Sequence, residues 1–436
     1  MFNIILGFIA QLGFISLSWR RPIYGLCLII ILLPSYLWRF DLVGLPTTFL
    51  EIMIWWLFII WLIKEQRFSR INWLFDKSAE NLVPKIWRYL ISIWLIISII
   101  ACLHNPTLTA LGLWRAYFLE PILFFIIFIY LIKDQADLKL VIKSFGLLLL
   151  GLFIVAIYQN FSGWNLPLAY DLPNVRRLTT IFSYPNALSL LVAPITAFFA
   201  GLYLVERRHN YLYLALFFVG FLLIWWTVSQ GAIAGVIFSI MVYGAYLVNK
   251  FLQSHYSFRI RGIVYTFILF VLLVLWFKHP LALKFRQELF QPQLNLAASS
   301  LEIRSSQWQE TFLMLKDHWW SGAGLAAYQL NMVPYHHVDW LEIYLYPHNL
   351  FLNFWSELGI LGLLCFLAIL FFIIREFKFL FKNNQILFWP LLFMWLTWFV
   401  QGLVDVPYFK NDLSVLFFIQ LGLLLIAKRL NNRFTL

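Results

Sequence analysis

The chain has 436 residues, of which 62% are hydrophobic and only 12% are charged. This balance excludes a soluble globular protein, because too few polar residues remain to cover a water-facing exterior. The formal net charge is +12, but most of the cations flank apolar runs, as they do in membrane proteins. We therefore expect no nucleic-acid partner and predict a polytopic membrane protein that is embedded in the lipid bilayer.

Apolar runs long enough to cross a bilayer recur along nearly the whole chain. They predict spans at 3–18, 22–37, 46–63, 87–103, 116–132, 138–158, 187–205, 211–229, 231–249, 262–278, 348–374, 386–404 and 411–427. We expect an all-α protein with twelve or thirteen crossings, since the first two runs are short and broken near Pro22. The first run lacks a basic start and a small-residue cleavage site, so we do not expect it to be a signal peptide.

Lys and Arg residues are concentrated on alternate connections between these spans. Cytoplasmic loops carry the excess of Lys and Arg, which assigns the connections at 64–86 and 375–382 to the cytoplasm, together with the C-terminus. The connections at 161–186, 279–347 and 405–412 then share the extracytoplasmic face.

Three parts follow from this pattern. A bundle of transmembrane helices occupies 1–278, a long extracytoplasmic loop occupies 279–347, and a second group of transmembrane helices occupies 348–436. We find no internal repeat and no separate soluble domain.

The long loop is predicted to contain an amphipathic helix at about 301–317. Trp308, Phe312 and Leu315 recur at helical spacing on one of its faces. Arg304 lies near the start of this helix, where an arginine is unfavourable for the helix dipole. This local conflict indicates that Arg304 has an anionic partner.

Three groups of polar residues lie on the connections assigned to the outer face. They are Arg176 and Arg177 with Asn186, Arg304 with Trp308, and His348 with Asn349. A guanidinium binds phosphate oxygens at any working pH, and a histidine accepts a proton from a hydroxyl near neutral pH. If their helices are neighbours, these groups can form one site for an anionic substrate.

Each candidate also has a structural interpretation. An interfacial arginine is often a membrane anchor, and a histidine beside Asn349 can simply cap a helix. Asp405 either orients a cationic group or ends a helix. His336 and His337 lie near Asp339, but their spacing matches no zinc pattern, so we expect no metal site.

Motifs for nucleotide chemistry are missing from the sequence. There is no Asp-x-Asp metal clamp, no Walker motif and no dinucleotide-binding fingerprint. We therefore expect no cofactor, and the substrate must carry its own activated leaving group.

Several motifs, taken in chain order, resemble the O-antigen ligase/polymerase family. They are Arg177-x-x-x-x-Phe182-x-x-Pro185-Asn186, Arg304-x-x-x-Trp308, Gly322-Ala323-Gly324, Pro347-His348-Asn349-x-Phe351-Leu352, Glu357-x-Gly359-Ile360-x-Gly362, and Gln401-Gly402-Leu403-Val404-Asp405 followed by Lys410. The resemblance extends from about residue 170 to 427. One departure is Ser229-Gln230-Gly231, where family members usually have Arg or Lys at the middle position.

The resemblance implies a GT-C-like glycosyltransferase of the bacterial cytoplasmic (inner) membrane, with its active site on the extracytoplasmic face. Such an enzyme passes a glycan from a polyprenyl-pyrophosphate donor to a glycan or glycolipid acceptor, with inversion and without a metal. It implies His348 as the general base, with Arg177 and Arg304 stabilising the pyrophosphate. The residues expected to bind substrate are Arg176, Trp308, Asn349, Asn186 and Asp405.

Alternatives remain open at this stage. A ligase would use a lipid A–core sugar as acceptor, a polymerase another lipid-linked repeat, and a protein O-oligosaccharyltransferase a protein hydroxyl. A flippase for lipid-linked glycans is the non-enzymatic alternative. It would be expected to have repeated halves and charges within the spans, whereas the cations of this sequence lie mainly on loops.

Overall fold

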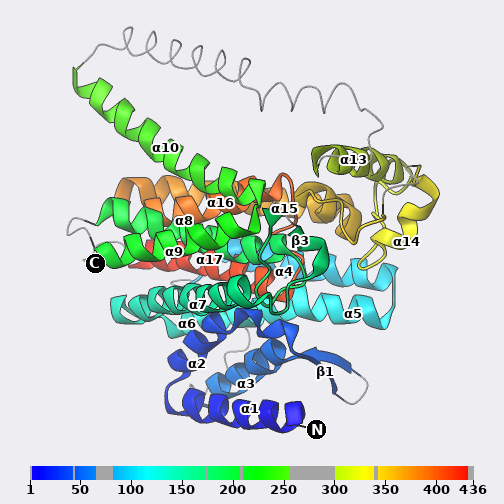
Figure 1. Ribbon diagram of the computed structural model, residues 1–436, viewed down its shortest axis with the longest axis horizontal. Coiled ribbons are helices and arrows are strands. Elements are labelled where there is room, and N and C mark those ends of the chain that lie inside the picture. The colour runs from blue at the N-terminus through cyan, green and yellow to red at the C-terminus, as the bar shows by residue number, and fades with distance from the viewer. Residues whose placement is uncertain are drawn as a thin grey trace.

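The computed structural model describes residues 2–42, 45–64, 82–172, 175–206, 210–255, 300–337 and 342–430. In these ranges the chain is almost entirely helical, apart from two short hairpins. The long helices lie side by side, and the N-terminal helices pack along one edge (Figure 1).

The first part of the chain runs from α1 to α7. Its elements are α1 (Phe2–Arg20), α2 (Pro22–Ile31), the 3₁₀ helix η1 (Leu33–Leu37), β1 (Arg39–Leu42), β2 (Leu45–Thr48), α3 (Phe49–Lys64), α4 (Lys85–His104), α5 (Leu108–Trp114), the π-helical turn η4 (Arg115–Leu119), α6 (Glu120–Leu131) and α7 (Gln135–Ser162). β1 and β2 pair antiparallel, with Arg39 opposite Thr48.

The second part adds the helices that surround the site. Its elements are η5 (Leu168–Tyr170), β3 (Asp171–Leu172), β4 (Val175–Arg176), α8 (Pro185–Val205), α9 (Tyr211–Thr227), α10 (Gln230–His255), α13 (Ser300–Asp317), α14 (Tyr328–Met332), η6 (Val333–Tyr335), α15 (Leu350–Asn383), α16 (Gln385–Gly402) and α17 (Asn411–Arg429). β3 and β4 form the second hairpin.

Within the described residues the predicted spans correspond mainly to helices, although the first residues of the span at 46–63 belong to β2. Eight helices in the described ranges are long and apolar enough to cross a membrane, and two further apolar helices, α2 and α9, are shorter. The predicted span at 262–278 lies outside the described residues. At 22–37 the α-helix ends at Ile31 and a 3₁₀ turn follows, because Pro34 cannot continue the hydrogen-bonding ladder.

Two helices form the centre of the bundle. In α17 every residue from Asp412 to Ala427 is buried, and α8 is buried over nearly its whole length. A helix that is apolar on all sides is expected in such a position. Gly201 of α8 lies so close to α16 that a Cβ atom would come within 2.5 Å of the Pro390 Cα. The N-termini of α8 and α17 both open toward the functional site described below.

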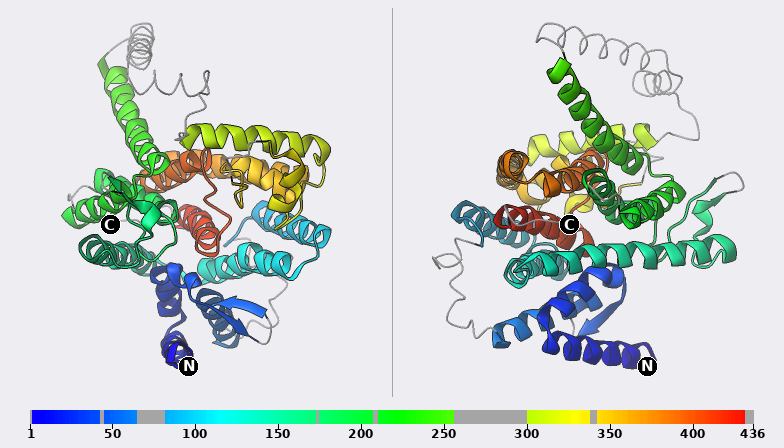
Figure 2. Two further views of the ribbon diagram at one scale, coloured as in Figure 1. Left: turned by 45° about the vertical axis from the view of Figure 1, so that its right-hand side comes forward. Right: turned by 90° about the vertical axis from the view of Figure 1, so that its left-hand side faces the viewer.

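The loop that carries α13 and α14 is attached to one end of the bundle, opposite the C-terminus (Figure 1). The predicted amphipathic helix at 301–317 corresponds to α13, which packs against α15 (Figure 2). Its apolar face forms a small core of its own. That core includes Met314, Leu315, Tyr328, Met332 and Leu352.

A break in α15 anchors the segment between α13 and α14. Gly359 has φ 70° and interrupts the helix, and a Cβ atom there would come within 2.3 Å of the Trp320 carbonyl oxygen. The backbone N–H of Ile360 donates to the Trp320 carbonyl at 3.1 Å, and that of Ala323 donates to the Ser356 carbonyl at 2.7 Å. Only glycine adopts this backbone conformation without strain, which explains the glycine of this motif.

Candidate functional site

A cavity of about 600 Å³ opens at the end of the bundle that carries α13 and α14. Its walls come from η1, β1, η4, η5, Arg177 directly after β4, the start of α8, α13, α14, the segment before α15 and the start of α17. The charged residues among the described lining are Arg39, Arg177, Arg304, Glu342 and Lys410, with His348 beside them. Cations outnumber acids, so the cavity favours an anionic ligand.

A smaller cavity of about 200 Å³ adjoins the first and shares Arg177, Asn186 and Arg304 with it. The N-terminus of α10 lines it from Ser229 onward, and Asp405 lies in its wall. Helix N-termini present unpaired N–H groups and a partial positive charge, which suits phosphate. Gln230, at the position where the related motif usually has a cation, also lines this cavity.

A chain of hydrogen bonds links the candidate cation to the candidate base. The Arg177 guanidinium donates to Asn186 Oδ1 at 3.2 Å, and Asn186 Nδ2 donates to Asp405 Oδ2 at 3.2 Å. The other carboxylate oxygen, Asp405 Oδ1, lies 3.3 Å from His348 Nδ1. Asp405 therefore holds the proton on Nδ1 and leaves Nε2 of His348 as the nitrogen that can accept a proton.

The charges around Asp405 keep it ionised. Burial acts to raise its pKa, but the hydrogen bond and charge of His348, and the charge of Arg304, outweigh burial and hold the pKa below its usual range. Its side chain is only 13% exposed, against 27% for His348. Arg177 also has a lowered pKa, because of burial and the nearby charge of Arg304.

The backbone at His348 is held in an unusual conformation. Its φ is +46°, a value that costs free energy for a residue with a side chain and that often occurs at functional sites. Contacts of the two flanking residues, Pro347 and Asn349, stabilise this conformation. Asn349 caps α15 by accepting from the N–H groups of Phe351 and Leu352, and the Trp308 indole donates to the Pro347 carbonyl at 2.8 Å.

Arg304 enters the site from the first turns of α13 and lines both cavities. The structure gives it no ion pair or hydrogen bond to any other described residue, so the anionic partner expected from the sequence is not a neighbouring side chain in these ranges. Its charge acts on Asp405 at longer range. An unpaired guanidinium in a cavity is available to an anionic ligand.

Five of the eight predicted site residues line a cavity. Arg177, Asn186, Arg304 and His348 line the larger cavity, and Asp405 lies in the wall of the smaller one.

Three further predicted residues lie outside the described lining of both cavities. Trp308 and Asn349 fix the backbone around His348. Arg176 forms an ion pair with Asp171 at 2.7 Å and donates to the Asn160 carbonyl, which fastens the β3–β4 hairpin to α7.

The histidines considered for a metal site have another role. His336 Nδ1 lies 3.0 Å from the Glu310 carboxylate, and the His337 backbone N–H donates to the same carboxylate at 2.8 Å. These contacts fasten the end of η6 to α13. Asp339 lies outside the described residues.

Sequence reasoning missed several residues of the larger cavity. Arg39 lies on β1, in a run predicted only to join two spans, and Lys410 was noted only as part of a motif. Six tyrosines in the lining also could not be recognised as site residues, because aromatic residues make up 20% of the chain and single tyrosines do not stand out. They are Tyr36, Tyr117, Tyr170, Tyr184, Tyr344 and Tyr346.

Glu357, an acid within an apolar run, has the partner that its burial requires. Its carboxylate accepts from the backbone N–H of Ala326 at 2.7 Å. Together with the break at Gly359, this contact fixes the segment between α13 and α14 onto α15. The element that carries Arg304 is thereby attached to the helix that begins beside His348.

Comparison with known families agrees with the motifs. The O-antigen ligase family model matches residues 214–367, a segment that contains both Arg304 and His348. A comparison with curated proteins gives no match. The family match supports a lipid-linked glycan transferase family in general, and the apolar helices indicate repeated membrane crossing. The chain is therefore a multi-pass membrane protein in which residues 214–367 are similar to the O-antigen ligase family.

Proposed function

We propose that this protein transfers a glycan from a polyprenyl-pyrophosphate donor to an acceptor hydroxyl on the extracytoplasmic face of the bacterial cytoplasmic membrane. The observation that carries the proposal is the hydrogen-bonded chain from Arg177 through Asn186 and Asp405 to His348. It supports a phosphate-binding role for Arg177 and a general-base role for His348 at the same cavity. The reaction inverts the anomeric carbon and uses no metal or cofactor.

The donor pyrophosphate occupies the smaller cavity and the boundary with the larger one. Arg177 and Arg304 are shared by both cavities, and their guanidinium groups can each bind two phosphate oxygens. The N-termini of α8 and α10 add N–H donors to the same place. Arg177 and the helix N-termini are held in place before the substrate arrives, which favours strong electrostatic stabilisation.

The chemical step breaks the bond between the anomeric carbon and the pyrophosphate oxygen. Negative charge develops on that oxygen as polyprenyl pyrophosphate leaves. Arg304 has no competing ion pair among the described residues, so its charge is free to stabilise the leaving group. Arg177, held by Asn186 and by the Thr227 carbonyl at 2.9 Å, is the positionally fixed member of the pair.

His348 acts on the other reactant. Its Nε2 accepts the proton of the acceptor hydroxyl while the hydroxyl oxygen attacks the anomeric carbon and the leaving group departs. Asp405 stabilises the imidazolium that forms and keeps the ring in the correct tautomer. The proton is then released to water through the open cavity.

Tyrosines provide the surface for the sugars. Tyr344 contacts the His348 ring edge-to-face, with ring centroids 5.3 Å apart, and Tyr170 lies under the Arg177 guanidinium at 5.8 Å. Each such ring combines an apolar face with a hydroxyl that can hydrogen-bond, a combination that suits glycans.

The orientation in the membrane follows from the charged ends of the helices. α17 begins at the cavity and ends with Lys428 and Arg429, and Lys428 pairs with Glu376 of α15 at 2.7 Å. The end of the bundle away from the cavity is therefore basic. By the positive-inside rule we assign this end and the C-terminus to the cytoplasm, and the cavity to the extracytoplasmic face.

The test uses the purified full chain in proteoliposomes with a polyprenyl-pyrophosphate-linked glycan. Release of polyprenyl pyrophosphate and the identity of the molecule that carries the glycan afterwards are both measured. We expect release with the parent protein and not with His348→Gln, with transfer to a glycolipid acceptor favoured by the O-antigen ligase match. Transfer to a second donor molecule would indicate a polymerase, and transfer to protein an oligosaccharyltransferase. Movement of intact donor across the membrane without bond cleavage would contradict the proposal.

A further inference from the structure

The larger cavity contains two cations that the proposed donor site does not use. Arg39 of β1 and Lys410, which immediately precedes α17, line the 600 Å³ cavity, and neither lines the smaller cavity that Arg177 and Arg304 share. Lys410 and Arg39 are close enough to affect each other. Burial lowers the pKa of Lys410 and the charge of Arg39 lowers it further, while Asp412 and Asp405 oppose both effects.

Neither cation is neutralised by a close partner. The Lys410 ammonium lies 4.2 Å from the centroid of the Tyr184 ring, and within the described ranges it forms no ion pair with an acid. Arg39 is exposed in the cavity wall and likewise has no ion pair to a described residue. A half-buried lysine with no carboxylate in contact is stabilised when an anionic ligand supplies the opposite charge.

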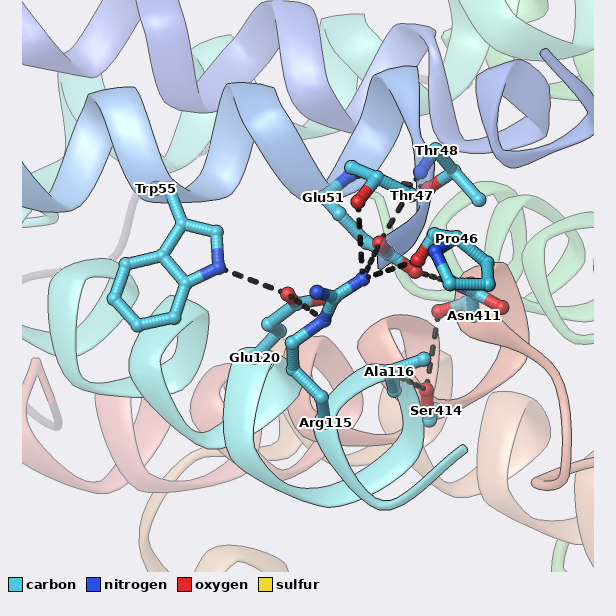
Figure 3. Close-up of polar contacts among 10 residues, drawn as sticks. All are labelled: Pro46, Thr47, Thr48, Glu51, Trp55, Arg115, Ala116, Glu120, Asn411 and Ser414. Atoms are coloured by element: carbon cyan, nitrogen blue, oxygen red, sulfur yellow. Dashed lines mark hydrogen bonds and ion pairs between the residues drawn. The ribbon is translucent and has the colours of Figure 1, made fainter. Parts of the chain in front are cut away.

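A buried ionic network holds the two elements that carry these cations (Figure 3). Arg115 donates to the carboxylate of Glu51 at 2.6 Å and to the Pro46 carbonyl of β2 at 2.8 Å. The other oxygen of Glu51 accepts from Asn411 Nδ2, also at 2.6 Å. Because β2 pairs with β1 and Asn411 follows Lys410, one network fixes the positions of both Arg39 and Lys410.

Burying the charged groups of this network costs free energy, which indicates that the network has a role beyond joining helices. Glu51 is only 4% exposed and Glu120, the second acid beside Arg115, only 1%. Ionisable groups buried at membrane depth are usually functional. Arg115 also begins a π-helical turn, a distortion that recurs near functional sites. Figure 3 shows Arg115 between these two carboxylates, with Asn411 close to Glu51.

We propose that Arg39 and Lys410 form a second anion-binding subsite, which takes a phosphate or carboxylate group carried by the acceptor. The inference rests on the proposed function, because it assigns the donor pyrophosphate to Arg177 and Arg304. The N-terminus of α17, a helix of 19 residues, contributes its positive end to the same place. The acceptor is therefore a sugar phosphate or a uronic acid rather than a neutral sugar.

The tyrosines agree with this assignment. Tyr36 lies close to Arg39 in the sequence, and Tyr117 lies close to Arg115. Both tyrosines line the larger cavity. An acceptor sugar that packs on these rings can present its anionic group to Lys410 and a hydroxyl to His348. The anionic group then fixes which hydroxyl reacts, so this subsite would determine acceptor specificity.

The experiment measures binding to the intact chain in nanodiscs by native mass spectrometry. The probes are glucose 6-phosphate, glucuronate, glucose and polyprenyl pyrophosphate. We expect the two anionic sugars to bind at least about tenfold more tightly than glucose, as each charge-assisted hydrogen bond contributes about that much. The double variant Arg39→Gln/Lys410→Gln should lose this advantage and bind polyprenyl pyrophosphate within about twofold of the parent.

Three variants complete the design. Arg304→Gln should weaken the binding of polyprenyl pyrophosphate and leave the binding of the anionic sugars unchanged. Lys316→Gln, which removes an exposed lysine of α13 outside both cavities, should change neither. Arg39→Lys/Lys410→Arg keeps both charges and should bind like the parent, which separates a loss of charge from a loss of folding.

Two outcomes overturn the subsite. In the first, the double glutamine variant binds anionic sugars as tightly as the parent. In the second, the double glutamine variant no longer binds polyprenyl pyrophosphate but still binds the anionic sugars, which would assign both cations to the donor site. Unchanged binding of polyprenyl pyrophosphate to Arg304→Gln would instead contradict the proposed donor site, and the anionic-sugar result would still decide the subsite by itself.

Discussion

Replacing Asp405 with asparagine tests the proposed mechanism most directly. The carboxylate accepts three hydrogen bonds, from His348 Nδ1, from Asn186 Nδ2 and from the backbone N–H of Val406 at 2.9 Å. All three partners are donors. An asparagine has the same size but only one accepting oxygen, so its amide group must face at least one donor. Rotation to satisfy Asn186 turns the amide toward His348 and favours the tautomer with the proton on Nε2.

The expected loss can be estimated from this geometry. A histidine held in the wrong tautomer cannot accept the acceptor proton, and in serine proteases the equivalent change lowers kcat by about 10⁴. The contact between Asp405 and His348 is longer than an ideal charged hydrogen bond, at 3.3 Å, so we expect a smaller loss of about 10²–10³. This corresponds to about 3–4 kcal/mol of transition-state stabilisation, because each tenfold change is about 1.4 kcal/mol.

The assay is the initial rate of polyprenyl-pyrophosphate release in proteoliposomes, with donor KM measured separately. Asp171→Asn is the matched control, because it removes a carboxylate that pairs with Arg176 on the same face of the molecule. Surface pairs contribute little, so the control should retain at least about a third of the parent rate. If Asp405→Asn also retained a third of the rate, or if Asp171→Asn lost as much as Asp405→Asn, the role of Asp405 would be refuted.

Four further predictions follow from the same structure. Arg304→Gln should lower kcat by about 10²–10³, as loss of a preorganised charge stabiliser does, whereas Arg176→Gln should have little effect on the release assay. Trp308→Phe removes the hydrogen bond to the carbonyl before the base, so we expect kcat to fall about tenfold with donor KM unchanged. Gly359→Ala introduces a Cβ at a positive φ and should lower stability by about 2 kcal/mol or more in thermal denaturation, while Gly151→Ala, with open space around it, should not. Activity should be unchanged after treatment with a chelator, and loss restored by a divalent ion would contradict the metal-free mechanism.

The helices could be predicted from the sequence because membrane spans need only length and apolarity. The predicted helix at 301–317 also matches α13, but its buried face is formed by Met314 and Leu315, whereas Phe312, which was predicted on the apolar face, is 49% exposed. Element ends were less predictable. The run at 116–132 begins earlier, at Leu108, and contains a π-helical turn. Arg115, which begins that turn, contacts Glu51, which is 64 residues away in the chain, and no local pattern encodes such a contact.

The site was predictable where residue chemistry was unusual for its surroundings. Arginine and histidine at the ends of apolar runs pointed to Arg177, Arg304 and His348. Their placement around one cavity depends on helix packing that the sequence does not show. Trp308 illustrates the opposite case. An aromatic residue near a predicted glycan site suggests stacking on a sugar, but the structure also shows that the Trp308 indole N–H donates to the Pro347 carbonyl, which only the fold reveals.

The walls of the larger cavity come from positions as far apart as Tyr36 and Asn411. Among the Arg, Lys and His residues in the described lining of the two cavities, the segment that matches the family model, 214–367, supplies only Arg304 and His348. A fragment restricted to that segment would lack Arg177, Asp405 and the groups opposite them. Grafting it onto another scaffold is therefore not expected to transplant activity, and chimaeras between related proteins should exchange α1–α3 and α17 as a matched set.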